Sequence, residues 1–243
     1  MNLPYFDWSA RWEQERRYKG HQISNEDLPS RIKSVIDLWK MEIPLDWERE
    51  NWTFLQQREF RRSDEDDPQS EHKLEIKLFD LSKWTIAGAK LPVYLYPELN
   101  EISFGNQGKG QRKIDVLALL EIEGITTPLA IEMKGKSTNN CWFAVVENLQ
   151  QLPLLHSYPQ ALLAANPLLK PFEQLPLAQS RGMVLAPPEF FDSKGQKQNS
   201  FRQAKELARA LRKELGIIIL LAAFNKNVQG QIDLLSDVPT LTR

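Results

Sequence analysis

Residues 114–134 read IDVLALLEIEGITTPLAIEMK, which is the clearest structural pattern in the chain. It begins with an apolar run that is interrupted by one acid, Asp115. A turn with a glycine follows, and a second apolar run ends in the triplet EMK. Two apolar runs joined by a glycine-bearing turn are typical of a β-hairpin. The sequence therefore predicts two paired strands, 114–120 and 128–134.

The charges of this hairpin fall on one face. Side chains alternate between the two faces of a strand, so Glu132 and Lys134 lie together on the face opposite Ile131 and Met133. Asp115 lies near the start of the preceding strand. The predicted hairpin therefore brings Asp115 beside Glu132.

The first ninety residues combine several short patterns. Apolar positions after Pro29 have helical spacing and end before Pro44, which predicts an amphipathic helix. Residues 52–62 and 73–79 are candidate strands, and the acidic stretch 63–71 between them is typical of a solvated loop. We interpret residues 1–90 as an extension, partly helical and partly β, that supplies substrate contacts or a dimer interface.

Residues after the hairpin alternate between helical and strand patterns. Asn140 is a helix cap, and Pro153 limits the helix that follows. Residues 183–186 form a short apolar strand, and Ser200 caps a strongly amphipathic helix that ends at Gly216.

The apolar run 217–223 has the composition of a strand that is buried on both faces. The order strand, strand, helix, strand, helix, strand predicts an α/β core with a central mixed β-sheet flanked by helices. We assign this core to residues 91–243.

Composition narrows the function classes. The 243 residues carry a net charge of -1, so nucleic-acid binding requires a local basic face. The single cysteine, Cys141, excludes an intrachain disulfide and cysteine-based zinc sites. No apolar run is long enough to span a bilayer, and no apolar signal core is visible. We therefore expect a cytoplasmic protein without a membrane segment.

The three charged residues of the hairpin suit phosphodiester chemistry. Two carboxylates, Asp115 and Glu132, supply the oxygen ligands that Mg²⁺ prefers. A bound metal polarises the phosphoryl group and orients a water molecule. Lys134 can position that water and offset charge that develops in the transition state. The alternative is a half-exposed hairpin with an ordinary surface salt bridge.

This constellation resembles the PD-(D/E)xK nuclease superfamily, which is restriction-endonuclease-like in fold. The resemblance rests on Asp115 and on Glu132-Met133-Lys134, and it covers mainly residues 100–155. It implies metal ligands at Asp115, Glu132 and the Met133 backbone carbonyl, with Lys134 as the catalytic lysine. The proline of the family motif is absent, since Ile114 precedes Asp115.

The resemblance also suggests further polar residues. An upstream glutamate often adds a ligand in this superfamily, and by position the candidates are Glu101, Glu98 and Glu75; each is alternatively a surface acid. Gln151 resembles a catalytic glutamine on the helix after the Glu-x-Lys strand. Neighbouring Gln150 and Tyr158 fit the same arrangement, although Pro153 interrupts its spacing.

Basic residues flank the motif. Lys109, Arg112 and Lys113 precede Asp115 in a glycine-bearing stretch, and Lys136 follows Lys134. Such a patch could hold a nucleic-acid backbone, or could serve solubility alone. The same two interpretations apply to the basic side of the helix after Ser200. The N-terminal tryptophans could stack on bases or could pack in a core; they are Trp8, Trp12, Trp39, Trp47 and Trp52.

From these residues we expect a nuclease that hydrolyses DNA with Mg²⁺ or Mn²⁺. Superfamily members that cut duplexes often pair, so a homodimer or a partner subunit is expected beside DNA. Two alternatives stay open. One is a binding or scaffold subunit of a defence or recombination complex that keeps the fold without catalysis. The other is an enzyme that cuts RNA.

Overall fold

A computed structural model describes residues 24, 26–40, 55–56, 69–104, 112–136, 140–157, 159–165, 167–191 and 196–236. At its centre lies the predicted hairpin, formed by β4 (Arg112–Ile122) and β5 (Ile125–Met133). The two turn residues, Glu123 and Gly124, both have positive φ, as two-residue hairpin loops require. The hairpin prediction is confirmed.

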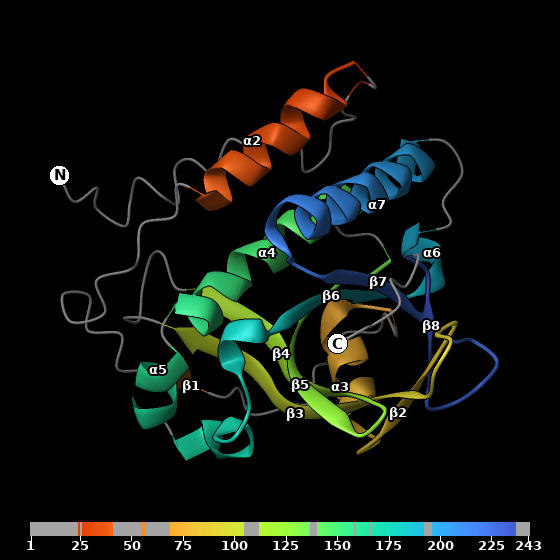
Figure 1. The fold of residues 1–243 in the computed structure, drawn as a ribbon. Coiled ribbons are helices and arrows are strands. Elements are labelled where there is room, and N and C mark those ends of the chain that lie inside the picture. Colours follow the sequence, from red (N-terminus) through yellow and green to blue (C-terminus); the bar gives the residue numbers. More distant parts are fainter. Residues whose placement is uncertain are drawn as a thin grey trace, which may run out of the picture.

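Six further strands join this hairpin in one sheet (Figure 1). They are β1 (Leu55–Gln56), β2 (Trp84–Ala87), β3 (Val93–Phe104), β6 (Arg181–Ala186), β7 (Ile219–Phe224) and β8 (Gln231–Leu234). β5, β6 and β7 are parallel to one another, and the hairpin pair β4–β5 is antiparallel. The predicted strands at 183–186 and 217–223 are thereby confirmed as β6 and β7.

The expected open central sheet is wrong, because seven of the described strands close into a barrel. The order runs β3-β2-β8-β7-β6-β5-β4, and β4 then pairs with β3 again. Closure depends on β3, which is twelve residues long, pairs with β4 along its length and pairs with β2 near its start. A register shift between Pro97 and Leu99 in β3 is a bulge, and bulges bend strands.

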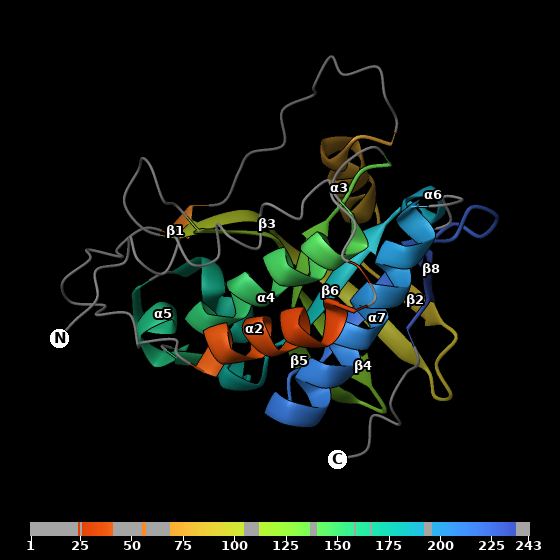
Figure 2. The ribbon, with the colours of Figure 1, turned by 90° about the horizontal axis from the view of Figure 1, so that it is seen from above.

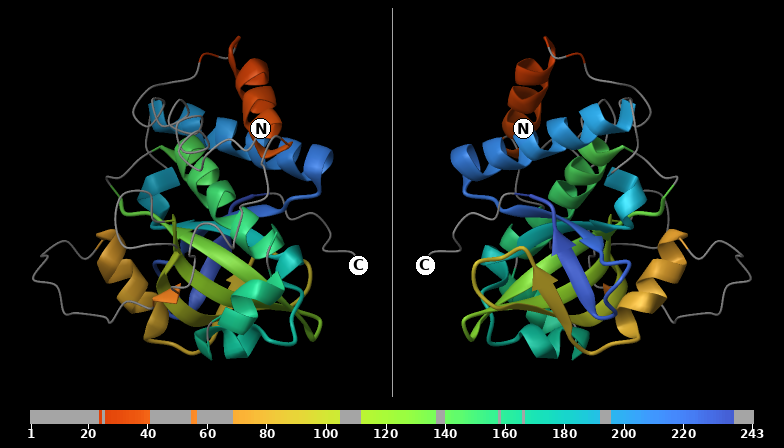
Figure 3. Two further views of the ribbon diagram at one scale, coloured as in Figure 1. Left: turned by 90° about the vertical axis from the view of Figure 1, so that its left-hand side faces the viewer. Right: turned by 90° about the vertical axis from the view of Figure 1, so that its right-hand side faces the viewer.

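β2 and β8 complete the ring as parallel neighbours, although they lie far apart in the sequence. Figure 3 shows these gold and blue strands side by side. Residues on both sides of position 90 therefore contribute to one sheet. β1 extends the sheet at the other end of β3.

Alternation along the strands separates two cores. Inward residues such as Val116 on β4 and Ile131 on β5 fill the barrel, together with Leu74 and Leu78 of α3 (Glu71–Phe79). Outward residues such as Leu117 pack beneath the helices. The expected strand at 73–79 is wrong: the segment is α3, and the Ser70 hydroxyl caps it by accepting the Lys73 N–H.

Three helices cover the outer face of the sheet. α4 (Cys141–Ser157) packs on β5 and β6, α7 (Gln196–Leu215) packs on α4, and α2 (Leu28–Lys40) packs on α7, as Figure 2 shows from above. Short helices fill the connections: α5 (Pro159–Ala165), η2 (Pro167–Phe172), η3 (Leu177–Gln179) and α6 (Pro188–Phe191). None of the helices in the described chain has the length and apolar character of a membrane-crossing segment.

Two of the predicted helix boundaries need adjustment. The Asn140 cap is confirmed, since its Oδ1 accepts the Phe143 N–H, but α4 continues through Pro153 to Ser157. α7 begins at Gln196, so Ser200 lies inside the helix, where its hydroxyl accepts the Trp142 N–H. The stop at Gly216 is confirmed by its positive φ and by its N–H, which donates to the Arg212 carbonyl.

Candidate functional site

The candidate site lies on the outer face of β4 and β5, beneath α4. In the ladder, Val116 is opposite Ile131 and Leu117 is opposite Ala130. One further step places Asp115 opposite Glu132. The Met133 N–H donates a hydrogen bond of 2.8 Å to Asp115 Oδ2, which ties the acid of one strand to the backbone of the next. The predicted approach of Asp115 to Glu132 is thus present.

Glu132 and Lys134 form a buried ion pair at the end of β5. Their exposed fractions are 6% and 4%, and Lys134 Nζ lies 2.5 Å from Glu132 Oε1. The Lys134 N–H donates to the Leu185 carbonyl at 3.0 Å, so β6 fixes the backbone where the lysine leaves the sheet. Neither side chain can move far without breaking these contacts.

Two further acids approach the same ammonium group. Lys134 Nζ lies 3.1 Å from Glu147 Oε2 on α4 and 3.7 Å from Glu71 Oε1 on α3. Sequence reasoning missed both residues. Glu147 precedes Gln151 by one helical turn, which is a usable signal, whereas the approach of Glu71 depends on how α3 packs.

α4 supplies the amide network that holds Glu132. Gln151 Nε2 donates to Glu132 Oε2, and Asn148 Nδ2 donates both to Gln151 Oε1 at 3.1 Å and to the Ala130 carbonyl at 3.0 Å. Gln151 therefore lies in the site, as expected from the sequence. Asn148 was missed, although it lies one turn before Leu152 on the helix face that meets the sheet.

A glycine makes room for this network. A Cβ atom on Gly182 of β6 would lie 2.0 Å from Asn148 Oδ1, which no structure tolerates without displacement. Asn148 is fully buried. Gly182 is thus required where the amide of α4 meets the sheet.

Several acids crowd around Lys134, and of the two proposed metal ligands Glu132 is buried and Asp115 is half-buried. Burial raises the pKa of Asp115 to about 6, against smaller opposing effects of Lys134 and of the Met133 N–H. Burial also raises the pKa of Glu132 well above its ordinary value, and the charge of Asp115 adds to this shift. A nearby cation stabilises the charged form of both acids.

Lys134 keeps its proton in this environment. Burial opposes the charged form, but the surrounding carboxylates, Glu132 foremost, raise the lysine pKa above its ordinary value. The group is therefore a fixed cation, and it has no capacity to accept a proton near neutral pH.

The oxygen donors fit a divalent cation of the Mg²⁺ type. The two hydrogen bonds of Glu132 occupy two of about four lone-pair positions on a carboxylate, so coordinating capacity remains. No three His, Cys, Asp or Glu side chains of the described chain converge as a metal cage. Mg²⁺ is commonly held by one or two carboxylates with water and substrate phosphates, which is the donor set that Asp115 and Glu132 offer.

Of the other acids suggested by the sequence, Glu101 lies next to Asp115 in the ladder, between the pairs Asn100–Val116 and Ile102–Ile114. Glu101, on β3, has a positive φ and binds Lys113 Nζ at 3.1 Å. Glu98 is partly buried, which raises its pKa. Glu75 is buried on α3, 3.8 Å from His72. Their roles as metal ligands, like that of the Met133 carbonyl, stay predictions.

The predicted basic patch is described only in part. Lys113 and Lys136 are exposed on either side of the site, and the Lys136 N–H donates to the Gln69 carbonyl at 3.3 Å. Lys109 and the side chain of Arg112 lie outside the described residues. Tyr158 and the tryptophans at positions 8, 12, 47 and 52 also lie outside the described residues. Trp39 belongs to α2, and its ring packs against His156.

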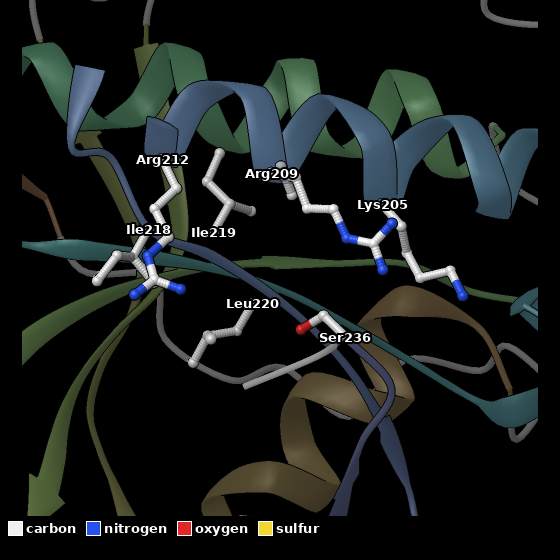
Figure 4. Close-up of a pocket in the computed structure, with 8 residues that line it drawn as sticks. Lys205, Arg209, Arg212, Ile218, Ile219, Leu220 and Ser236 are labelled. Atoms are coloured by element: carbon white, nitrogen blue, oxygen red, sulfur yellow. The ribbon is translucent and has the colours of Figure 1, made fainter. Parts of the chain in front are cut away.

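The basic side of α7 lines a groove of its own. Lys205, Arg209 and Arg212 reach down from the helix along β7, and Ser236 forms the opposite wall (Figure 4). Arg209 and Arg212 are exposed to solvent. The groove offers positive charge that could meet a nucleic-acid backbone, as the sequence suggested, and it lies apart from the acids of β4 and β5.

Comparison with protein families, with curated proteins and with solved structures finds no match to this chain. What the chain does is therefore argued from its site alone.

Proposed function

We propose that this protein is a nuclease that hydrolyses phosphodiester bonds in DNA with Mg²⁺ or Mn²⁺. The observation that carries the proposal is the meeting of Asp115, Glu132 and Lys134 on one face of a paired hairpin. Two acids with raised pKa values lie 17 residues apart in sequence, and the pairing of β4 with β5 and the Met133 N–H bring them together. Perturbed carboxylates beside a fixed cation are frequent at functional sites.

The acids would hold the metal. Asp115 is oriented by the Met133 N–H, and Glu132 is oriented by Gln151 and Lys134, so both carboxylates are preorganised. A bound Mg²⁺ polarises the phosphoryl group and lowers the pKa of a coordinated water. The chain's own part is to fix the oxygen ligands and to exclude water from their far side.

Lys134 would act as a charge and not as a base. Its ammonium group is buried among carboxylates and stays protonated. A fixed cation beside the reacting phosphate orients the anionic substrate and stabilises charge that develops on its oxygens. Gln151 is a positioning residue in this proposal, because its described contacts reach Glu132 and Asn148.

The resemblance to PD-(D/E)xK nucleases supports this proposal at the level of these residues alone. Lys113 and Lys136 are the described cations nearest to the motif in sequence, and they are suited to backbone contacts. A homodimer or a partner subunit would supply the remaining substrate contacts if a duplex is cut on both strands.

A cleavage assay tests the proposal. The native chain, Asp115→Asn and Asp80→Asn are incubated with duplex DNA, single-stranded DNA and RNA in Mg²⁺, Mn²⁺ or EDTA. Asp80 is an exposed acid at the end of α3 and serves as the matched control. We expect metal-dependent DNA cleavage by the native chain and by Asp80→Asn, and none by Asp115→Asn.

Four results would count against the proposal. Cleavage that persists in EDTA excludes the metal, and equal cleavage by Asp115→Asn excludes this site. Cleavage of RNA but not of DNA would mean that RNA is the substrate. Binding of DNA without any cleavage would favour the scaffold alternative.

A further inference from the structure

A second polar pocket, of about 380 Å³, lies at the other end of the parallel strands. Its walls include Thr127 near the start of β5, Arg181 at the start of β6, and Gly216 before β7. Glu132 lies five residues beyond Thr127 along β5, which corresponds to roughly 17 Å. The pocket is therefore separate from the proposed metal site.

Arg181 is an unsatisfied cation in this pocket. Its Nη1 atom is inaccessible to solvent and has no hydrogen-bond partner among the described residues. The residues that line the pocket include no acid. Nη1 is closed to water and therefore also to a ligand oxygen, so a ligand would reach the guanidinium group on its accessible side, where half-buried Arg181 lines the pocket. An oxygen acceptor with negative charge there would compensate a half-buried cation that has no acidic neighbour among the lining residues.

His156 adds a second nitrogen-bearing side chain. Its Nε2 lies 2.9 Å from the Ser180 carbonyl and must donate to it, because a carbonyl oxygen only accepts. Nδ1 is then the nitrogen that takes up a proton when the ring becomes charged. The edge-on ring of Trp39, 5.8 Å away between centroids, fixes the imidazole from the side of α2.

We propose that this pocket binds a small oxyanion, a phosphate or carboxylate group, through Arg181 and His156. Arginine presents a planar fork of N–H donors that matches both groups. The volume lies within the range of small-molecule pockets and exceeds that of a bare ion. The pocket therefore has room for a ligand with a body beside its anionic group, and Trp39 is among the residues that would border that body.

The groove beneath α7 provides a contrast. Its arginines are exposed, so water already solvates them. Arg181 differs because part of its guanidinium group is shut off from water without a partner among the described residues. Lys90 is exposed and lines neither groove, so it serves as the control cation.

Calorimetric titration of the full chain tests the proposal with inorganic phosphate, citrate and adenosine monophosphate. The proteins are the native chain, Arg181→Met, Arg181→Lys and the control Lys90→Met. We expect the native chain and Lys90→Met to bind alike, and Arg181→Met to bind about tenfold or more weakly, as expected for loss of a charged hydrogen bond. Arg181→Lys keeps the charge but loses the fork, so its affinity falls in between.

A second measurement is independent of any variant's folding. Nuclear magnetic resonance of the native chain follows the His156 ring, whose pKa burial lowers, and a bound oxyanion should raise that pKa. Tighter binding of citrate or of adenosine monophosphate identifies the carboxylate or phosphate source. No binding of any probe, or equal binding by Arg181→Met, overturns the proposal. Either result leaves DNA cleavage through Asp115 untouched.

Discussion

The Asp115 carboxylate accepts the Met133 N–H at 2.8 Å, so the acid of β4 is bound to the residue that separates Glu132 from Lys134 on β5. This hydrogen bond fixes the position of Asp115 relative to Glu132 and Lys134. The register of the hairpin therefore determines which charged groups meet in the site. A change at Asp115 therefore tests both.

Asp115→Asn should abolish metal-dependent cleavage while raising stability at pH 8. The asparagine oxygen can still accept the Met133 N–H, but the side chain no longer carries a charge that burial disfavours. Thermal unfolding and the cleavage assay are measured on the same samples, with Asp80→Asn as the control. A lower melting temperature for Asp115→Asn would contradict this account of the site.

The hairpin was predictable because its pattern is local. Both apolar runs, the glycine turn and the three charges lie within residues 114–134. Closure of the barrel was not predictable, because it depends on the pairing of β2 with β8. These strands have four residues each and lie far apart in the sequence. Short strands carry too little pattern to be recognised, and register over such distances leaves no local signal.

α3 shows how two periodicities can compete. Leu74, Ile76 and Leu78 alternate as in a strand, yet Leu74 and Leu78 are also four apart, as on one helix face. The structure buries Leu74 and Leu78 in the barrel and leaves Ile76 only half-buried. The same error hid Glu71, because only the helix brings its carboxylate near Lys134.

Stability of the metal-free protein should fall as pH rises from about 4 to about 6. The pKa of Asp115 is raised to about 6 and the pKa of Glu132 is raised well above its ordinary value, whereas both titrate near 4 when unfolded. In that window the folded chain binds more protons than the unfolded chain, so the free energy of unfolding decreases with pH. Urea unfolding at pH 4.5, 6 and 8 measures the slope.

Mg²⁺ should reverse this trend. It competes with protons for the two carboxylates, so it should raise the melting temperature at pH 8 more than at pH 5. The Asp115→Asn variant should show a flatter pH dependence and little response to Mg²⁺. An equal Mg²⁺ effect at both pH values, or in the variant, would speak against binding at these acids.

Lys134→Met should destabilise the protein by about 3–5 kcal/mol at pH 8. The variant leaves Glu132, Glu147 and Glu71 facing one another without the buried cation that they share. Lowering the pH protonates the acids, so most of the loss should be recovered at pH 5. Lys136→Met, which removes an exposed lysine two residues later, should change the free energy of unfolding by less than about 0.5 kcal/mol.

Gly182→Ala should cost about 1–3 kcal/mol and reduce cleavage, because the added methyl displaces Asn148. Asn148 holds Gln151, and Gln151 holds Glu132, so a change on β6 should reach Glu132, the proposed metal ligand on β5, through α4. Combining Gly182→Ala with Asn148→Ala removes the clash. If the clash is the cause, the double variant loses less stability than the sum of the two single losses. Strict additivity, measured by urea unfolding, would mean that Gly182 and Asn148 act separately, and the route from β6 to Glu132 would then be excluded.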